Sequence, residues 1–193
     1  FVNREDVDDN EGMSVDSILD IVESNEHLRK LTVGNNRIQL GHMEKICSVL
    51  CRGSIVELDL FNCFENGLGY DMISSLLTSG GLAKLETLGL ESNGITSSSI
   101  TLLANFLVTN PPLQKLDLRD NILDDNDAQA LANALRSNTT LRSLRLYGNA
   151  IGDAGKEALR LVLHGDGNLN SIADSNHSCV VDGLFGGWNV DEK

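Results

Sequence analysis

The sequence predicts an α/β solenoid, a stack of repeats in which short parallel strands alternate with helices. One spacing, Leu-x-x-Leu-x-Leu-x-x-Asn-x-Ile or a close substitute, returns six times along the 193 residues. After these motifs the apolar residues change from strand spacing to helical spacing. A fixed period near 28 residues is typical of repeat arrays, whose stacked units present an extended surface.

The first element expected is a helix over residues 15–24. Ser14 is placed as its N-cap, and Met13 and Ile18 are placed as the hydrophobic staple around that cap. This helix would cover the first repeat, because a solenoid exposes apolar surface at an uncapped end. Residues 1–13 are expected to form an acidic tail, since their carboxylates lack the Gly and Glu positions of a calcium-binding loop.

The six motifs supply the expected strands. They begin at Leu28, Ile55, Leu85, Leu113, Leu141 and Leu169, which lie 27, 30, 28, 28 and 28 residues apart. Cys63 replaces the Asn of the second motif, and Asp174 replaces a core leucine of the sixth. We therefore expect an irregular second repeat and a sixth strand motif, from Leu169 to Cys179, that closes the stack.

A helix follows each strand motif and returns the chain to the next strand. In the fifth repeat one helical face carries Ala154, Ala158, Leu159, Val162 and Leu163. The same spacing predicts helices over 41–51, 69–78, 97–108 and 127–136. Helical crossovers make neighbouring strands parallel. Because strands are narrower than helices, the sheet should line the inside of a curved stack.

The recurring Asn has a physical role where each strand turns. There, backbone N–H and C=O groups point into the interior without strand partners, and each unpaired group costs about 1–3 kcal/mol. A buried Asn side chain offers both a donor and an acceptor. We expect a ladder of Asn36, Asn93, Asn121 and Asn149, interrupted by Cys63 and ended by His177.

These motifs resemble the ribonuclease-inhibitor type of leucine-rich repeat over about residues 14–179. The segments IGDAGKEALRLVL at 151–163 and SNTTL at 137–141 are especially typical of it. The resemblance implies a right-handed α/β horseshoe, with parallel strands on the concave face and helices on the convex face, used for protein–protein interaction. Known members include ribonuclease inhibitors, Ran GTPase-activating proteins and the sensor regions of innate immune receptors. The chain departs from the pattern at Cys63, Glu65 and Asp174.

The expected domain organisation is an acidic tail over 1–13, a repeat domain over 14–179 and a C-terminal segment over 180–193. Two readings of that last segment stay open beside disorder. It forms an irregular cap over the last repeat, or it is a tail whose Phe185 and Trp188 dock on a partner or a second copy.

The amino-acid composition limits which classes of partner the protein is expected to bind. The formal net charge is −13, which argues against nucleic acid and against anionic membrane surfaces and favours a partner with a basic surface. No window approaches the length of a membrane span, and no signal peptide is visible. The four cysteines do not form a disulfide framework, so we expect free thiols in an intracellular compartment, the cytoplasm. The chain opens at Phe1 rather than Met, which is expected of a fragment or processed product.

The residues between the strand leucines should face out of the concave side and form rows. One row reads Gly34, Phe61, Glu91, Arg119, Tyr147 and Ser175; another reads Thr32, Asp59, Gly89, Asp117, Arg145 and Ala173. Aromatic residues and Arg are enriched at interface hot spots. The predicted partner-binding residues are Asp59, Phe61, Glu91, Asp117, Arg119, Arg145 and Tyr147.

The alternative is that these charges only satisfy one another. Glu91 with Arg119, and Asp117 with Arg145, are plausible cross-strand pairs, and Arg119 could lie over Tyr147.

No chemistry is indicated beyond binding. The chain has no phosphate-binding loop and no nucleophile elbow. His42, Cys47 and Cys51 share a helix, but three ligands at this spacing are not a known zinc finger, and the two cysteines are expected to be partly exposed thiols. We expect no metal and no cofactor. Sequons stand at Asn138 and Asn176, of which SNTT also serves as an ordinary helix-to-strand corner.

The expected function is a non-catalytic protein–protein interaction scaffold that binds through its concave face. Two alternatives remain open at this point: a regulator of a small GTPase, similar to Ran GTPase-activating proteins, and a structural subunit of a larger assembly.

Overall fold

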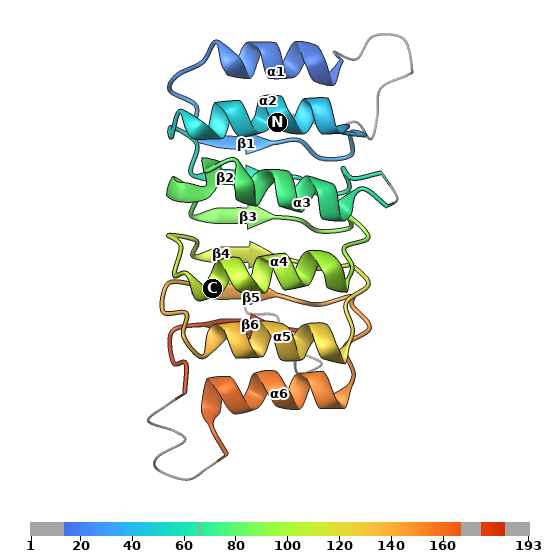
Figure 1. Cartoon of the computed structure of the whole chain (residues 1–193), viewed down its shortest axis with the longest axis vertical. Helices are drawn as coiled ribbons and strands as arrows, with labels where there is room; N and C mark the ends of the chain where they lie inside the picture. The colour runs from blue at the N-terminus through green and yellow to red at the C-terminus, as the bar shows by residue number, and fades with distance from the viewer. Residues whose placement is uncertain (1–13, 66, 167–174, 184–193) are drawn as a thin grey trace, which may run out of the picture.

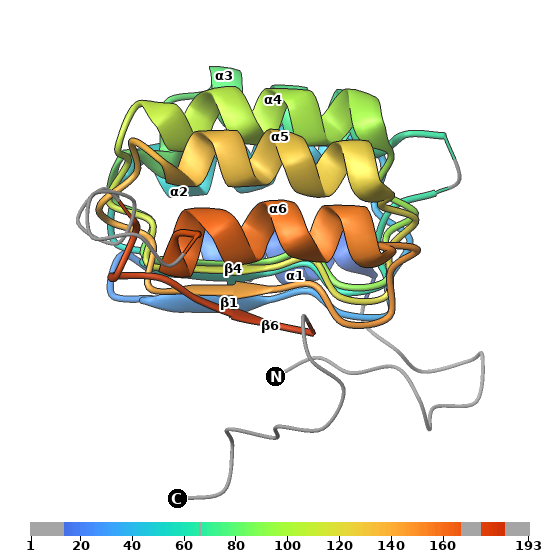
Figure 2. The same cartoon turned by 90° about the horizontal axis from the view of Figure 1, so that it is seen from below.

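A computed structural model of the chain describes residues 14–65, 67–166 and 175–183. Six strands form one parallel sheet in sequential order, and a layer of helices lies along one side of it (Figures 1 and 2). The elements are α1 (Val15–Glu23), β1 (Lys30–Thr32), α2 (Leu40–Cys51), β2 (Glu57–Asp59), α3 (Gly69–Thr78), the 3-10 helix η1 (Gly81–Lys84), β3 (Thr87–Gly89), α4 (Ser97–Val108), β4 (Lys115–Asp117), α5 (Asp125–Leu135), β5 (Ser143–Arg145), α6 (Asp153–His164) and β6 (Val180–Asp182).

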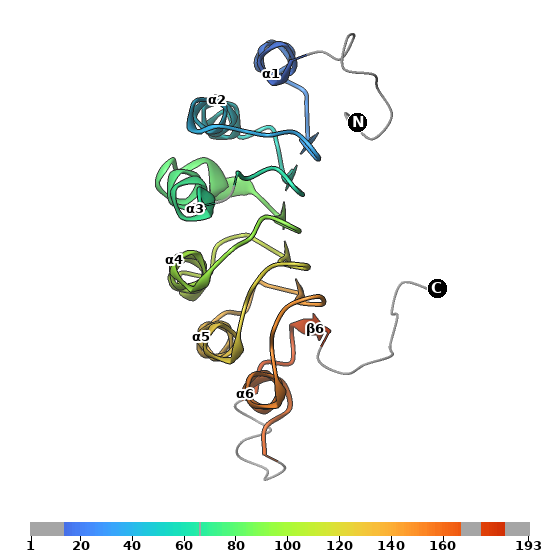
Figure 3. The same ribbon diagram turned by 90° about the vertical axis from the view of Figure 1, so that its right-hand side faces the viewer.

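The stack is an arc with its helices on the convex side and its strands on the concave side (Figure 3). Neighbouring strands lie about 4.8 Å apart, whereas packed helices need roughly 8–10 Å, so the helical layer follows the longer path. The predicted fold class, an α/β solenoid, is therefore confirmed.

Helix starts follow local capping. Ser14 caps α1, because its side chain accepts a hydrogen bond from the Ser17 N–H, while Met13 of the expected staple lies outside the described residues. Helix α5 begins two residues earlier than expected, since the Asp124 side chain accepts from the N–H of Asn126 and of Asp127. Helices α3 and α4 have the expected bounds.

The motif leucines make the core. In the sheet register, the middle residue of each of the first five strands stands beside its counterpart, so that Leu31, Leu58, Leu88, Leu116 and Leu144 stack from strand to strand. All five are buried, as are the opening residues Ile55, Leu85, Leu113 and Leu141. Replacing a fully buried leucine by Ala typically costs about 2–5 kcal/mol, so each repeat depends on its neighbours for this packing.

The expected Asn ladder is present. The Asn121 side chain accepts hydrogen bonds from the N–H of Asn93 and of Ile95, each at 3.0 Å. It also donates to the carbonyls of Leu90, Leu118 and Arg119. Asn93 does the same one repeat earlier, accepting from the N–H of Cys63 at 2.7 Å. Asn121 and Asn149 thus satisfy backbone groups of their own turn and of the turn before it, and Asn93 satisfies groups of the turn before it.

The Asn ladder is interrupted at Cys63, and it does not end at the residue expected. At the interruption, the Cys63 thiol donates to the carbonyls of Val33 and Phe61, so it partly takes over the role of an amide donor. The expectation that His177 ends the ladder is wrong. His177 is exposed, and its Nε2 lies 3.2 Å from the Ser175 Oγ in the corner before β6.

A second column of residues stands directly before the ladder. Each member has a left-handed backbone conformation, from φ 50° to φ 75°: Asn35, Asn62, Ser92, Asp120 and Gly148. In the first four, the N–H donates to a carbonyl of the next repeat, as Ser92 does to Arg119 at 3.0 Å. Asn, Asp and Gly tolerate this conformation, whereas Ser adopts it less readily. The pair formed by such a residue and the ladder position after it, which is Asn or, in the second repeat, Cys63, is therefore the turn that ends each of the first five strands.

The sixth strand lies later than expected. Residues 169–174 are outside the described part of the chain, and the strand that pairs with β5 is β6, with Asp182 opposite Arg145. The reason is a corner at Asn176, whose Oδ1 accepts from the N–H of Ser178 and of Cys179, as the Oδ1 of Asn138 does from Thr140 and Leu141.

This corner corrects the concave rows and explains the sequons. Asp182 takes the sixth place beside Arg145, where Ala173 was expected, and β6 falls beyond the expected boundary at 179. Ala173 itself lies outside the described residues. The side-chain amide of Asn138 donates to the Leu107 carbonyl at 2.7 Å, and that of Asn176 donates to the Leu135 carbonyl at 2.8 Å. Both sequon asparagines are therefore structural corners. The division of the chain into domains stays a prediction, because residues 1–13 and 184–193 lie outside the described ranges.

Asn121→Ala should lower the free energy of unfolding by at least about 3 kcal/mol, since it leaves several buried backbone groups unpaired at a cost of about 1–3 kcal/mol each. Urea denaturation measures the change. The matched control is Asn133→Ala on the exposed face of α5, where Ala is the better helix former and the change should stay within about 0.5 kcal/mol. Equal costs for the two variants would contradict the ladder's role.

Ser92→Asn should raise stability by on the order of 0.5 kcal/mol, because Asn adopts the left-handed conformation at φ 58° more readily than Ser. Thermal denaturation measures it as a small rise in Tm. Ser98→Asn in the first turn of α4 has ordinary helical backbone and serves as the control. A loss of stability in Ser92→Asn alone would show that the side chain, rather than the backbone, governs this position.

Candidate functional site

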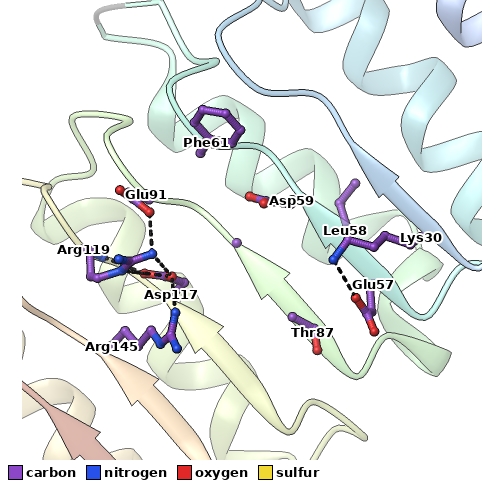
Figure 4. A pocket seen from close by; sticks show the side chains of 11 residues that line it. Lys30, Glu57, Leu58, Asp59, Phe61, Thr87, Glu91, Asp117, Arg119 and Arg145 are labelled. Carbon is purple, nitrogen blue, oxygen red and sulfur yellow. Dashed lines mark hydrogen bonds and ion pairs between the residues drawn. The ribbon is translucent and has the colours of Figure 1, made fainter. Parts of the chain in front are cut away.

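The candidate site is a shallow depression on the concave face. Six of the seven predicted partner-binding residues line it together: Asp59, Phe61, Glu91, Asp117, Arg119 and Arg145. The remaining lining residues are Lys30, Glu57, Leu58, Thr87 and Gly89 (Figure 4). The side chains converge because parallel strands in register place equivalent residues side by side. Of these residues, sequence reasoning did not single out Lys30 or Thr87.

Arg119 is the centre of an ion-pair network. Its Nε and Nη2 donate to the two carboxylate oxygens of Asp117 at 2.9 and 2.8 Å, and Nη2 also donates to Glu91 at 2.6 Å. The hydrogen bonds with Asp117 raise the pKa of Arg119, which therefore stays charged. The expected pair between Glu91 and Arg119 is confirmed. The forked geometry of the Arg119 pair with Asp117 fixes the guanidinium in one orientation.

Arg145 joins two carboxylates. Its Nη1 lies 3.6 Å from Asp117, which confirms the second expected pair, and its Nε lies 3.6 Å from Asp182. Asp182 also accepts a hydrogen bond from the Leu146 N–H at 3.0 Å. Sequence reasoning missed Asp182, although SNHSC at 175–179 repeats the corner signal SNTTL at 137–141 and places the sixth strand after it.

Asp59 differs from the other carboxylates of the depression. It is half-buried and forms no ion pair with any residue of the described ranges. Burial first, and then the negative charge of Asp117, raise the pKa of Asp59. Burial also raises the pKa of Glu91, against the attraction of Arg119. The face therefore holds negative charge under partial desolvation.

The two aromatic residues are placed differently. Tyr147 is 69% exposed at the end of β5, as expected of a residue that faces the solvent. Phe61 was expected to face water but is half-buried, because its ring lies over Gly34, where a Cβ would come within 1.8 Å of the ring. The proposed stacking of Arg119 on Tyr147 stays a prediction.

Three of the four cysteines are buried: Cys47, Cys63 and Cys179. Cys47 was expected to be partly exposed, but it is buried in the core, and burial raises its pKa. Cys51 is exposed. Burial raises the pKa of Cys63 and of Cys179 to about 12, so these two thiols are poor nucleophiles at neutral pH.

The alternative zinc set is not assembled by the fold. The Nδ1 of His42 accepts a hydrogen bond from the Gln39 N–H at 3.1 Å, and its Nε2 lies 3.4 Å from Asp16. In the described ranges, no three His, Cys, Asp or Glu side chains are grouped as metal ligands. Among the helices of those ranges, none has the length and apolar character needed to span a bilayer.

Among known proteins, a family model and a solved structure match parts of this chain. The family model described as Leucine Rich repeat matches residues 109–132 and 137–159, which contain β4, most of α5, β5 and part of α6. No curated protein matches the chain. A crystal structure of a Bacteroides fragilis protein is similar at 16% identity with a TM-score of 0.40, and the match covers 76% of this chain and 57% of that one.

Asp59→Asn should make the protein more stable near pH 7. The folded state raises the pKa of Asp59 above its usual 3.8, so it binds the proton more tightly than the unfolded state does. The ionised carboxylate therefore lowers stability above its folded pKa, and this penalty disappears as the pH falls toward 3.8. Urea denaturation at both pH values should show the variant's advantage only at the higher one.

Glu157→Gln on α6 is the control, because the pKa of Glu157 is shifted in the opposite direction: the hydrogen bond from Arg160 lowers it. It should give no gain at neutral pH. An Asp59→Asn variant that is less stable than the parent near pH 7 would contradict the account of Asp59.

Proposed function

We propose that this leucine-rich-repeat solenoid is a non-catalytic scaffold that binds a protein partner through its concave face. Leucine-rich repeats generally mediate protein–protein interaction, and the match to their family model supports the assignment. The observation that carries the proposal is Tyr147, a large aromatic side chain that is 69% exposed at the end of β5. An aromatic residue in this place packs no core, and aromatic anchors are typical of interface hot spots.

The neighbouring ion pairs support the same surface. Arg119 and Arg145 are held by three carboxylates, Asp117, Glu91 and Asp182, so their orientation is fixed before a partner arrives. Preorganised side chains lose less conformational entropy on binding than mobile ones. The ion pairs of Arg119 and Arg145 are already formed in the free protein. Such a network can still serve as a binding surface, and it favours a partner whose charges match its fixed pattern.

The repeat subtype and the setting are part of the proposal. A repeat of 28 residues, with a full helix in each unit, favours the ribonuclease-inhibitor type. The net charge of −13 favours a partner with a basic surface. All four cysteines are free thiols, which supports a reducing, cytoplasmic compartment.

Tyr147→Ala should weaken partner binding by roughly 30-fold, the scale of a hot-spot residue. The partner is first isolated by affinity capture on the native chain from its source, and its Kd is then measured by calorimetry for parent and variant. Arg160→Ala on α6 removes a long side chain from the convex layer and is the control. Circular dichroism should show that both variants keep the fold. A Tyr147→Ala protein with parental affinity would place the binding surface elsewhere.

A further inference from the structure

We propose that two copies of this chain pair back to back through the outer surface of α3 and α4. These two helices pack against each other in the middle of the convex layer (Figure 1). Their outer surface, the α3–α4 face, lies on the opposite side of the molecule from the strands (Figure 3). The pairing therefore leaves both concave faces open and does not depend on what binds there.

The α3–α4 face exposes apolar side chains. On α3, Tyr70 is 45% exposed, and Leu77 lies half-buried two turns later. On α4, Leu102 and Phe106 are half-buried one turn apart, and Val108 is 50% exposed at the end of the helix. Because residues spaced by one or two turns share a side of a helix, each helix offers apolar surface beyond the part that packs on the core.

The same face is the uncharged part of an acidic protein. Asp71 is the only charged residue within Gly69–Thr78 and Ser97–Val108, the full ranges of α3 and α4. Residues 92–114 contain no charged residue, although 22% of the chain is charged. Each of the other α-helices in the described ranges carries at least two. An uncharged centre between charged surroundings is the usual composition of a protein interface.

Covering this face costs little hydration of polar groups. The hydroxyls of Thr78 and Thr101, both exposed residues, donate to carbonyls one turn earlier in their own helices, at 2.8 and 3.0 Å. A hydroxyl whose donor is already used within the protein loses less on leaving water than a free one does. The polar residues of the face are thus compatible with burial against another surface.

The charge of the chain identifies a second copy as the occupant. Two chains of formal net charge −13 repel each other, so they approach closely only over a surface without charge. A two-fold axis brings the same patch of both copies together, and a charged residue at its centre would meet its own like charge. The neutral side chains of the α3–α4 face avoid that penalty. A basic partner would gain nothing there, because its charges are attracted to carboxylates elsewhere.

The size of the face sets the strength of the dimer. A helix of 12 residues, such as α4, is about 18 Å long, and two packed helices are roughly 20 Å wide. The face therefore covers on the order of 350 Å² per copy, less than half of the about 800 Å² per partner of a stable complex. We expect a weak, reversible dimer with a Kd on the order of 0.1 mM.

Such a dimer would be a bivalent scaffold. Since its two concave faces point away from each other, each copy keeps its own binding surface. A partner that carries the same binding segment twice would then gain avidity without any new contact.

Sedimentation equilibrium of the full chain, from about 10 μM to about 1 mM, tests the pairing. The average mass should rise with concentration from that of one chain toward that of two. Raising NaCl from about 0.05 M to about 0.5 M should tighten the dimer at least about threefold, because salt screens the repulsion between two acidic chains. A contact between charged surfaces would respond in the opposite direction.

Two matched variants locate the contact. Asn105→Glu adds one negative charge at an exposed position of α4, and Ala154→Glu adds the same charge at an exposed position of α6. Asn105→Glu should weaken the dimer at least about tenfold, since the new charges of the two copies would meet across the axis, whereas Ala154→Glu should change it less than about twofold. Circular dichroism checks that both variants keep the fold. If Asn105→Glu lost the fold, Thr101→Glu, also exposed on α4, would take its place with the same expected loss.

Three results would each overturn the proposal: a single chain at about 1 mM in high salt, a dimer that weakens as salt rises, or equal effects of the charges added on α4 and α6. None of them touches the proposed function, which is judged by the effect of Tyr147→Ala on the affinity for the partner. A loss of affinity in Tyr147→Ala with no dimer would leave a monomeric scaffold. A dimer with parental affinity in Tyr147→Ala would leave the pairing in place and move the partner's site.

Discussion

The buried Asn ladder is the interaction on which the rest of this structure depends. Each repeat must turn sharply after a strand of three residues, and each turn leaves backbone groups inside the stack. Asn93 and Asn121 satisfy those groups and tie each turn to the one before it. Since the turns are tied together, the strands stay in register, and the register is what places Asp59, Gly89 and Asp117 in one row.

Much of the fold could be predicted from the sequence because the same physical requirement recurs in every repeat. Leucines at strand spacing, the Asn at the turn and the helical face after it are local signals, and the bounds of α3 and α4 follow from them directly. The predicted position of the sixth strand was wrong because the sequence carries both a strand motif that begins at Leu169 and a corner signal at Asn176, and the strand follows the corner. The corner fixes the backbone through hydrogen bonds from the Asn176 side chain to the Leu135 and Asn138 carbonyls and from the Ser178 N–H to Asn176, whereas residues 169–174 of the motif lie outside the described ranges.

The sequence predicted most of the residues that line the site, but only some of the ion pairs between them. The period of two along a strand identifies which residues face outward, and sequence alignment of the repeats places Glu91 beside Arg119. Which groups remain unpaired depends on contacts that no spacing encodes. The ring of Phe61 lies over Gly34, and Asp182 joins the ion-pair network from β6, a strand that the sequence motif places earlier in the chain. Among the described residues, Asp59 is left without an ion pair.

Hydrogen–deuterium exchange of the chain, alone and with its captured partner, tests the central claim most directly. If the partner binds through the concave face, amide protection should rise at the ends of β2, β3, β4 and β5, over residues 57–62, 87–92, 115–120 and 143–148. The helices of the convex layer should exchange as they do in the free chain. Protection confined to α2 through α6, with the strand ends unchanged, would contradict the assignment of the concave face as the binding surface.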